Sequence, residues 1–537
     1  MTERPQRTRI FDESGRAQTL PDGSGQFDVL PGSGPLFFGL GPRPDLLPEW
    51  FPDAAGARYV ECPDAARQYG EAWLRKIPLS YHALAPEELT PALLRTAEIF
   101  RYKRGPRLFS AFWGPLFARC ELARSTLPAP PAPSAFFSAP PRASAAAKSV
   151  WLPLGEGDLL RIELTEAFAA AGWSVRALPP DDPETVADAL LQGGRPDLLL
   201  SVNAKGLDPH GRIFHLLREA GTRVAVWFVD NPFHLLTGLR SPFWTETDLF
   251  VTDAWFLAPL RRHGARRVHH LPLAVSTTLF HPDVPPPSGH AAGIEGRTVF
   301  VGRSAFPDKD AFFAGCALPG DLWAKAQAGF ELGERADFSW WLERFSERGI
   351  DQNYLWPGND VRQVGYCAEQ SGRHWRTACL RAANTPGKQH GAPDISSSLT
   401  IFGDEGWSEL LPPGTDLRGP VDYYAALPSI SRHAGCCLNM TSPLLPAGLT
   451  QRNFDVWAAG GLLLTDASPG LSIFPAELTA GVTFRTPSEI APLREKLVGT
   501  DRGDRLRAAW REHILSAHTY AHRLDKLFES LDGGPEK

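Results

Sequence analysis

Residues 436–466 read CCLNMTSPLLPAGLTQRNFDVWAAGGLLLTD, and this stretch decides the fold. Two apolar runs flank a helical segment, and the same rhythm starts upstream with RTVFVGR at 297–303 and LTIFGD at 399–404. Short apolar runs separated by helical spacers are typical of a parallel sheet that is buried on both faces. We therefore expect a doubly wound α/β domain over 297–504, with an insertion at about 316–398.

A second group of apolar runs lies before this domain. The pattern predicts another doubly wound α/β domain over 150–282, built from the strands KSVWLPL, WSVRAL, DLLLSVN, RVAVWFVD, DLFVTD and RVHHLPL. Open α/β sheets bind ligands beyond the carboxyl ends of their strands, so two such domains predict a site in the cleft between them. The chain closes with an amphipathic helical tail over 505–531, which we expect to pack back on the first of the two domains.

The front of the chain is a separate, smaller module. Pro, Ala and Ser dominate residues 125–149, and this composition is typical of a semi-extended linker. Before it, the runs PLFFGLG at 35–41 and ARYVEC at 57–62 predict a small α/β module over 1–124. Its Gly39-Leu40-Gly41 could form a nucleotide-binding turn, but a lone pair of glycines is more often a plain tight turn. The pattern assigns no chemistry to this module.

Composition excludes several classes of protein. The 537 residues carry a net charge of −6, and 43% of them are hydrophobic, which is typical of a folded globular chain. This balance lacks the basic surface that binds nucleic acid or an anionic membrane, so neither partner is expected. No integral membrane segment and no signal peptide are predicted, and the seven cysteines show no metal-like spacing. We expect a cytoplasmic protein with reduced thiols.

The stretch at 436–466 resembles the C-terminal signature of CgeB-like, spore-maturation type glycosyltransferases. The positions that match it are Asn439, Thr441, Gly448, Leu449, Arg452, Phe454, Ala458, Gly460, Gly461, Thr465 and Asp466. The resemblance implies that this loop and helix start hold a nucleotide sugar, and that Asp455, in place of the usual Glu, accepts hydrogen bonds from the ribose hydroxyls. The partner Glu of the retaining two-Glu motif falls at Ala447. Alternatively, Asp455 only caps or pairs on a helix.

Two neighbouring stretches extend the resemblance to retaining GT-B glycosyltransferases. LPLAVSTTLFHP at 271–282 is similar to the hinge between their two lobes. In VFVGRSAFPDKD at 299–310, Gly302 opens a turn that carries Arg303 and Lys309. Cations at a strand end suit a diphosphate, and the resemblance implies that these two side chains hold the donor diphosphate in binding and in the transition state. Otherwise both are solvated surface charges.

Glycines and polar residues of the first domain complete the candidate set. Gly155 and Gly157 allow close backbone approach to a ligand, and the resemblance implies a glycine turn facing the acceptor and the donor phosphate. Asp230 and His234 follow a buried strand, where side chains are well placed to contact the transferred sugar or the acceptor hydroxyl. A tight turn and a loop histidine without a role are the alternatives.

The spacing of the histidine pairs does not indicate a metal site. His269 and His270 are neighbours on a strand, so their rings point to opposite faces and do not share an ion. His518 and His522 are four residues apart, but the glutamate of a metalloprotease helix is missing between them. We expect no bound metal.

The resemblance implies an α/β GT-B fold, with two Rossmann-like domains facing a cleft, and a nucleotide-sugar dependent glycosyltransferase. It implies retention of anomeric configuration, no obligatory metal and no tightly bound cofactor beyond the donor substrate. The acceptor is a glycan, a lipid-linked glycan or a protein. A catalytically silent GT-B scaffold that serves as a binding module, and a nucleotide-sugar epimerase, are the alternatives. The donor base, the sugar, the acceptor, and retention against inversion stay open.

Overall fold

The computed structural model describes residues 8–125, 148–350, 355, 358–384 and 399–533. The chain divides into two compact units. The first unit contains residues 1–158, 172–226 and 239–247, and the second contains residues 159–171, 227–238 and 248–537. Most of the expected linker at 125–149, namely 126–147, lies outside the described residues.

A five-stranded front sheet forms the core of the N-terminal module. Its strand order is β3-β7-β4-β5-β6, and only β3 is antiparallel to its neighbour. The strands are β3 (Phe27–Leu30), β4 (Pro35–Phe38), β5 (Arg58–Val60), β6 (His82–Ala83) and β7 (Glu98–Tyr102). Around the sheet lie the hairpin β1 (Thr8–Phe11) and β2 (Ala17–Leu20) and the helices α1 (Leu47–Trp50), α2 (Pro63–Tyr69), α3 (Glu71–Leu74), α4 (Pro91–Thr96), α5 (Gly105–Leu108) and α6 (Ser110–Arg124).

The Gly39-Leu40-Gly41 turn packs against aromatic side chains of its own module. Both glycines have positive φ, 79° and 68°. A Cβ atom on Gly39 would lie 3.2 Å from Cβ of Tyr102, and Trp73 Nε1 donates to the Gly41 carbonyl at 2.9 Å. The turn therefore serves as a tight connection filled by aromatic rings.

Helix α6 attaches the front module to the next domain inside the first unit. It packs on α9 (Arg212–Glu219), where Arg212 pairs with Glu121 at 2.7 Å and Arg119 pairs with Glu219 at 3.1 Å. His215 lies buried between the helices, and burial lowers the pKa of its imidazole to about 4. A neutral ring therefore fills this contact near pH 7.

Gly114 should be indispensable for this contact, because a Cβ atom there would lie 2.1 Å from His215 Cδ2. We expect Gly114→Val to lower the free energy of unfolding by about 1–3 kcal/mol through overpacking. Urea unfolding followed by tryptophan fluorescence measures the loss. Ala111→Val on the exposed side of α6 is the control, and equal stability of the two variants would contradict the packing described.

The first doubly wound sheet has the strand order β13-β12-β11-β10-β8-β9, with parallel pairing at β8–β9, β8–β10 and β12–β13. Its strands are β8 (Ser149–Pro153), β9 (Ser174–Leu178), β10 (Leu198–Val202), β11 (Arg223–Phe228), β12 (Asp248–Val251) and β13 (Arg267–His270). The helices are α7 (Arg161–Ala170), α8 (Pro183–Leu191), α9, α10 (Pro232–Leu236) and α11 (Leu257–Arg262). Each strand corresponds to an apolar run expected from the sequence.

The second doubly wound sheet lies wholly in the second unit and is parallel throughout, in the order β16-β15-β14-β17-β18-β19. Its strands are β14 (Thr298–Val301), β15 (Leu399–Phe402), β16 (Asp416–Arg418), β17 (Cys436–Asn439), β18 (Leu463–Asp466) and β19 (Thr483–Phe484). The chain changes direction across the sheet between β14 and β17. Such a switch point opens a ligand crevice at the carboxyl ends of those strands.

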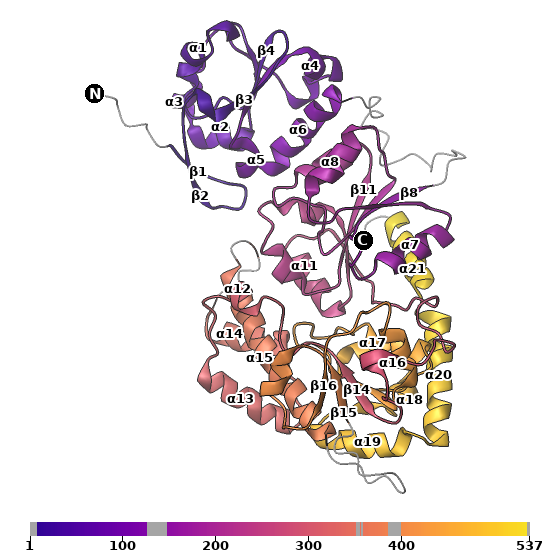
Figure 1. Ribbon diagram of the computed structural model, residues 1–537. Helices are drawn as coiled ribbons and strands as arrows, with labels where there is room; N and C mark the ends of the chain where they lie inside the picture. Colours follow the sequence, from indigo (N-terminus) through magenta and orange to yellow (C-terminus); the bar gives the residue numbers. More distant parts are fainter. Residues whose placement is uncertain (1–7, 126–147, 351–354, 356–357, 385–398, 534–537) are drawn as a thin grey trace. The chain divides into compact units, whose positions relative to one another are not determined.

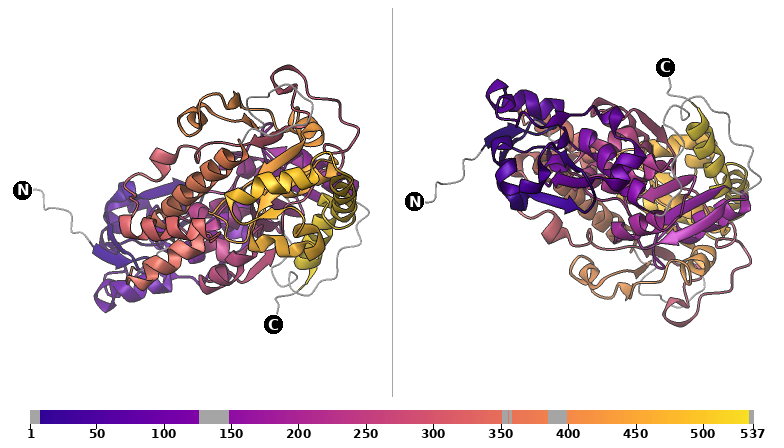
Figure 2. Two further views of the ribbon diagram at one scale, coloured as in Figure 1. Left: turned by 90° about the horizontal axis from the view of Figure 1, so that it is seen from below. Right: turned by 90° about the horizontal axis from the view of Figure 1, so that it is seen from above.

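Helices flank this second sheet on both sides (Figure 1). Between β14 and β15 the chain forms α12 (Lys309–Phe312), α13 (Gly320–Glu331), α14 (Phe338–Glu347) and α15 (Asn359–Ala383), so the expected insertion is helical where described. Helices α14 and α15 lie side by side (Figure 2, left). Later in the chain follow α16 (Leu427–His433), α17 (Arg452–Ala458), α18 (Ala476–Thr479) and α19 (Ile490–Leu497).

The C-terminal tail is two helices, α20 (Asp501–Ala517) and α21 (Tyr520–Asp532), not the single helix expected from its pattern. The break falls where Thr519 caps α21 and pairs with Val275 in a short parallel bridge. Beyond it, α21 packs on α7, with the rings of Phe168 and Phe528 5.9 Å apart (Figure 1). A Thr side chain that accepts a hydrogen bond from its own first turn favours a new helix start over continuation.

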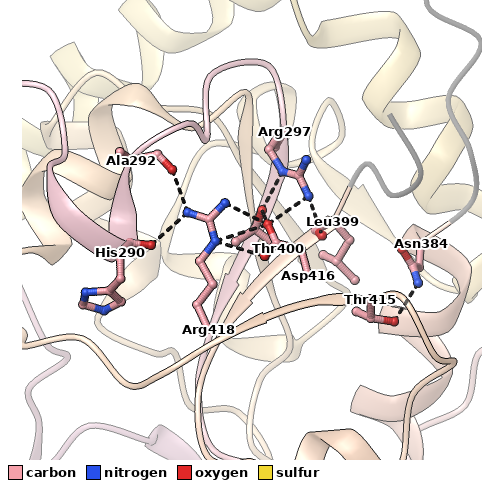
Figure 3. A network of polar contacts seen from close by, with 9 residues as sticks. All are labelled: His290, Ala292, Arg297, Asn384, Leu399, Thr400, Thr415, Asp416 and Arg418. Carbon is pink, nitrogen blue, oxygen red and sulfur yellow. Dashed lines mark hydrogen bonds and ion pairs between the residues drawn. The ribbon is translucent and has the colours of Figure 1, made fainter. Parts of the chain in front are cut away.

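A polar network closes the amino-terminal edge of the second doubly wound sheet (Figure 3). Asp416 accepts hydrogen bonds from Arg297 at 3.1 Å, Arg418 at 2.8 Å and Thr400 at 2.9 Å. Burial raises the pKa of this carboxyl, but the bonds from Arg418 and Thr400 outweigh it and hold the pKa below its usual value. Arg418 also donates to the carbonyl of Ala292, so one carboxylate connects β14, β15 and β16 to the preceding loop.

Asp416→Ala should leave the Arg297 guanidinium, whose side chain is 14% exposed, without its charged partner. We expect a loss of about 1–3 kcal/mol in the free energy of unfolding. Thermal unfolding at pH 7 gives the difference. The exposed Asp504→Ala on α20 serves as control, and an Asp416→Ala variant as stable as this control would contradict the role of the network.

Candidate functional site

The loops that follow β14 and β17 form the candidate site. Both loops belong to the second unit. Gly302 and Arg303 follow β14, while Met440 to Gln451 connect β17 to α17. Both loops start at the switch point of the parallel sheet. This is the edge at which open α/β sheets hold phosphorylated ligands.

Asp466 fixes the start of the second loop. Its Oδ1 accepts hydrogen bonds from the backbone N–H of Thr441 at 2.8 Å and from its hydroxyl at 2.9 Å. Oδ2 accepts one from Trp375 Nε1 of α15 at 3.1 Å. Burial raises the pKa of this carboxyl, while a charge from Arg335 and the bonds from Thr441 act against the rise. Thr441 is thus an internal anchor of the loop.

Arg452 and Asn439 fix the rest of the loop. The guanidinium donates to Asn439 Oδ1 at 3.0 Å and to the carbonyl of Val301 at 2.6 Å. Asn439 also donates to Thr465 at 3.0 Å and accepts a bond from the Thr450 hydroxyl at 2.9 Å. These two predicted residues therefore meet each other and join β14, β17 and α17 in one buried network.

Asp455 lies in an enclosed cluster of hydroxyl and amide groups. The carboxylate is 1% exposed and accepts hydrogen bonds from Tyr423 Oη at 2.7 Å and Gln451 Nε2 at 3.2 Å. Burial raises its pKa well above the usual range. Glu163, near the start of α7, lies in the same cluster: its Oε2 accepts a bond from Tyr424, and its Oε1 is buried without a partner among the described residues. Burial in this cluster therefore disfavours the charged form of both carboxyls.

Gly448 and Leu449 complete the loop. A Cβ on Gly448 would lie 2.6 Å from Cβ of Leu445, so only glycine fits there, and Leu449 is buried. The neighbouring Ala447 donates its backbone N–H to Asp253 Oδ2 at 2.9 Å. Sequence analysis did not name Asp253 as a candidate. It follows the apolar run DLFVT at the end of β12, as Asp230 follows β11, and this position is the sequence feature that indicates it.

Asp230 and His234 lie beyond β11 in different surroundings. Asp230 is exposed. Next to it, Asn231 donates to the carbonyl of Leu444 at 2.9 Å and caps α10. The ring of His234 contacts Phe312 and Phe338, with centroids 5.2 and 6.0 Å away, and a Cβ on Gly365 would lie 2.1 Å from its Nε2. Burial lowers the pKa of His234 to about 3, so the ring is neutral in its aromatic pocket.

Arg303 stands on the loop after β14, and Lys309 is the first residue of α12, which follows that loop. Arg303 is exposed, while Lys309 is half-buried, with its Nζ 5.7 Å from the ring centroid of Tyr366. Two further cations near this loop, Arg373 and Arg376, come from α15 and were not anticipated, since the sequence pattern loses its resemblance over the insertion. Arg376 pairs with Glu369 at 3.1 Å.

Gly155 and Gly157 lie in the first unit. Gly155 N donates to Asp158 Oδ2 at 2.8 Å, and Asp158 pairs with Lys205 at 2.6 Å. A Cβ on Gly155 would make ordinary contacts, and one on Gly157 would meet no neighbour. The space around both glycines is therefore compatible with other residues.

No group of three or more His, Cys, Asp or Glu side chains arranged for a metal is found in the part of the chain that the structure describes. Its seven cysteines are free thiols, six of them buried. Among the described helices, none combines the length and apolar character needed to cross a bilayer.

The family model described as "Glycosyl transferase-like" matches residues 376–529. This region holds β15–β19, the loop before α17 and most of the tail. This region is therefore glycosyltransferase-like, and the strand orders confirm the expected architecture of two doubly wound sheets. A search of curated proteins finds no match.

Solved structures with a similar course of the chain were also found. An E. coli protein described as trehalose-6-phosphate, bound with UDP-2-fluoro glucose, has 14% identity and a TM-score of 0.39, covering 73% of this chain and 100% of its own. Anabaena Alr3699/HepE in complex with UDP-glucose has 9% identity and a TM-score of 0.41, covering 72% and 99%. A Thermobaculum terrenum O-GlcNAc transferase mutant has 14% identity and a TM-score of 0.33, covering 79% and 73%.

The buried carboxyl of Asp253 should make stability depend on pH. Burial raises its pKa from 3.8 to about 6, so the folded state retains this proton at a pH where the unfolded chain has lost it. Protonation therefore favours folding, and this contribution is complete below pH 4 and is lost as the pH rises through 6. Urea unfolding between pH 4 and 7 should show the stability of the wild type falling relative to Asp253→Asn by about 3 kcal/mol.

The exposed Asp504→Asn is the matched control, and its curve should run parallel to that of the wild type. If the Asp253→Asn curve also ran parallel to the wild type over this range, the buried carboxyl would not titrate as described.

Proposed function

We propose that this chain is a CgeB-like glycosyltransferase that moves a sugar from a nucleotide-sugar donor to a glycan, a lipid-linked glycan or a protein. The observation that carries the proposal is the buried network of Asn439, Arg452 and Thr441–Asp466 at the switch point of the second doubly wound sheet. It holds two loops at the edge where α/β sheets bind nucleotides, inside the region that matches the glycosyltransferase-like family.

In the proposed reaction, the bond between the sugar's anomeric carbon and the β-phosphate oxygen breaks, and its electron pair stays on the diphosphate. A new bond forms from the acceptor oxygen to the anomeric carbon, and Asp230, exposed at the end of β11, takes the acceptor proton. Arg303 and Lys309 stabilise the charge that develops on the diphosphate. His234 contributes a neutral ring beside α12, which begins at Lys309.

We further propose a retaining, metal-independent reaction in the cytoplasm without a tightly bound cofactor. Cationic side chains near the loop after β14 supply the charge that a metal supplies elsewhere. The domain division proposed is 1–124, 150–282 with the tail 505–531, and 297–504, in which the module 1–124 selects the acceptor. Insensitivity of donor hydrolysis to EDTA tests metal independence.

A catalytically silent scaffold is the second candidate, and a specific observation favours it. Ala447 has no carboxylate, and both oxygens of Asp455 are already hydrogen-bonded inside the protein, to Tyr423 and Gln451. In this case a nucleotide sugar binds without being consumed.

A thermal-shift screen against UDP-, GDP-, ADP- and TDP-sugars, followed by a hydrolysis assay on each hit, separates these candidates. We expect one donor to raise Tm and to be hydrolysed slowly. Stabilisation without turnover, in the presence of a panel of acceptors, would favour the scaffold, and no stabilisation by any donor would contradict both.

Variants then test the donor residues. Arg303→Ala and Asp455→Ala should each raise the donor Kd about tenfold, which corresponds to about 1.4 kcal/mol. Asp455→Asn keeps the size of the buried side chain and guards against an unfolded variant. Arg502→Ala, an exposed arginine on α20, should bind donor as the wild type does. Unchanged Kd in Arg303→Ala and Asp455→Ala would remove these residues from the donor site.

A further inference from the structure

Helix α15 runs across the carboxyl edge of the second doubly wound sheet. Its Glu369 Oε1 accepts a hydrogen bond from Phe306 N, in the loop after β14, at 2.9 Å. One turn later, Gly372 faces the loop after β17, since a Cβ there would lie 2.9 Å from Pro443 Cδ. Trp375 Nε1 reaches Asp466 at the end of β18. The segment 369–376 therefore lies at the ends of three neighbouring strands.

This segment carries an excess of positive charge. Arg373 and Arg376 belong to it. Burial and then the charges of these two arginines lower the pKa of Lys309, at the start of α12, while Glu369 and Asp310 act against the shift. Glu369 is the carboxylate that pairs with Arg376, at 3.1 Å; the side chain of Arg376 is 15% exposed and that of Glu369 is 3% exposed. Lys309, Arg373 and Arg376 stand against two carboxylates, Glu369 and Asp310, so the group keeps a net charge of +1. Like charges gathered in a half-buried place are unfavourable unless an anion joins them.

The two guanidinium groups also carry unused donors. In the described part of the chain, the Nε–H groups of Arg373 and Arg376 are both buried and lack a hydrogen-bond partner. Buried donors of this kind are rare, and an unmet one calls for an explanation. Guanidinium forks match phosphate oxygens in geometry and charge, and the net positive charge of this group favours an anion such as an esterified diphosphate.

We propose that Arg373 and Arg376 of α15, together with Lys309, bind the diphosphate of the nucleotide-sugar donor. This inference rests on the proposed function and extends it, because it places the principal diphosphate contacts on the helical insertion. Arg303 is exposed and takes a lesser part. Arg452 has a structural task instead, since its Nε donates to Asn439 and its Nη1 to the Val301 carbonyl.

Binding of inorganic pyrophosphate and of UDP-glucose, measured by calorimetry on the full chain, tests the proposal. We expect Arg373→Gln and Arg376→Gln each to raise both Kd values at least tenfold, and to reduce the dependence of pyrophosphate binding on salt. The matched control is Arg381→Gln, on the same helix, whose guanidinium donates to the Leu410 carbonyl instead; it should bind as the wild type does.

A second measurement needs no variant. Phenylglyoxal modifies accessible arginines, and mass spectrometry should show that pyrophosphate protects Arg373 and Arg376 but not Arg381. If pyrophosphate fails to bind the wild type, or if both variants bind it normally and no protection occurs, the proposal is overturned.

The outcomes separate this proposal from the function on which it rests. A wild type that consumes a nucleotide sugar while both arginine variants keep its Kd would retain the glycosyltransferase and overturn the α15 site. Arginine-dependent pyrophosphate binding in a chain that binds no nucleotide sugar would support the anion site and overturn the donor function.

Discussion

The buried guanidinium of Arg452 connects the parts of the second doubly wound sheet on which the candidate site depends. It donates to the end of β14 through Val301 and to the end of β17 through Asn439, while it stands at the start of α17. A buried guanidinium is stable only when acceptors meet its N–H groups. The loops after β14 and β17 therefore hold their positions together, and displacing either one leaves a buried N–H group of the guanidinium without its acceptor.

The loop between β17 and α17 is also held by polar residues that follow β11 and β12, two strands of the first doubly wound sheet. Asn231 reaches the Leu444 carbonyl, and Asp253 reaches the backbone of Ala447. All four residues belong to the second unit, so the loop is held at both its ends and its middle. A loop with several fixed points is preorganised, and less conformational entropy is lost when a ligand binds.

The acidic side chains of this region are buried and hydrogen-bonded within the protein, whereas its arginines keep N–H donors that a ligand can use. Asp455 and Asp466 use their oxygens within the protein, and burial raises the pKa of both. Arg373 and Arg376, by contrast, keep donors that no described residue uses. The balance favours an anionic ligand at the carboxyl edge of the sheet, in agreement with a donor whose charge lies in its diphosphate.

Local pattern in the sequence determined the strands of the two doubly wound sheets, because short runs of Val and Leu between helical spacers are buried in only this way. The resemblance to the CgeB-like signature, and not local pattern, singled out Asn439, Thr441 and Arg452, of which the structure joins Asn439 and Arg452 by a hydrogen bond. Tertiary structure alone decided which side chains meet. Arg373 and Arg376 lie about 70 residues from Lys309 in sequence, inside an insertion, and only the course of α15 across the strand ends brings them to the loop that precedes it. Likewise, packing of α21 on α7 and the cap at Thr519, which divide the tail, depend on contacts with residues more than 200 positions away. Contacts between such distant positions leave no trace in local periodicity, which records only which face of an element is buried.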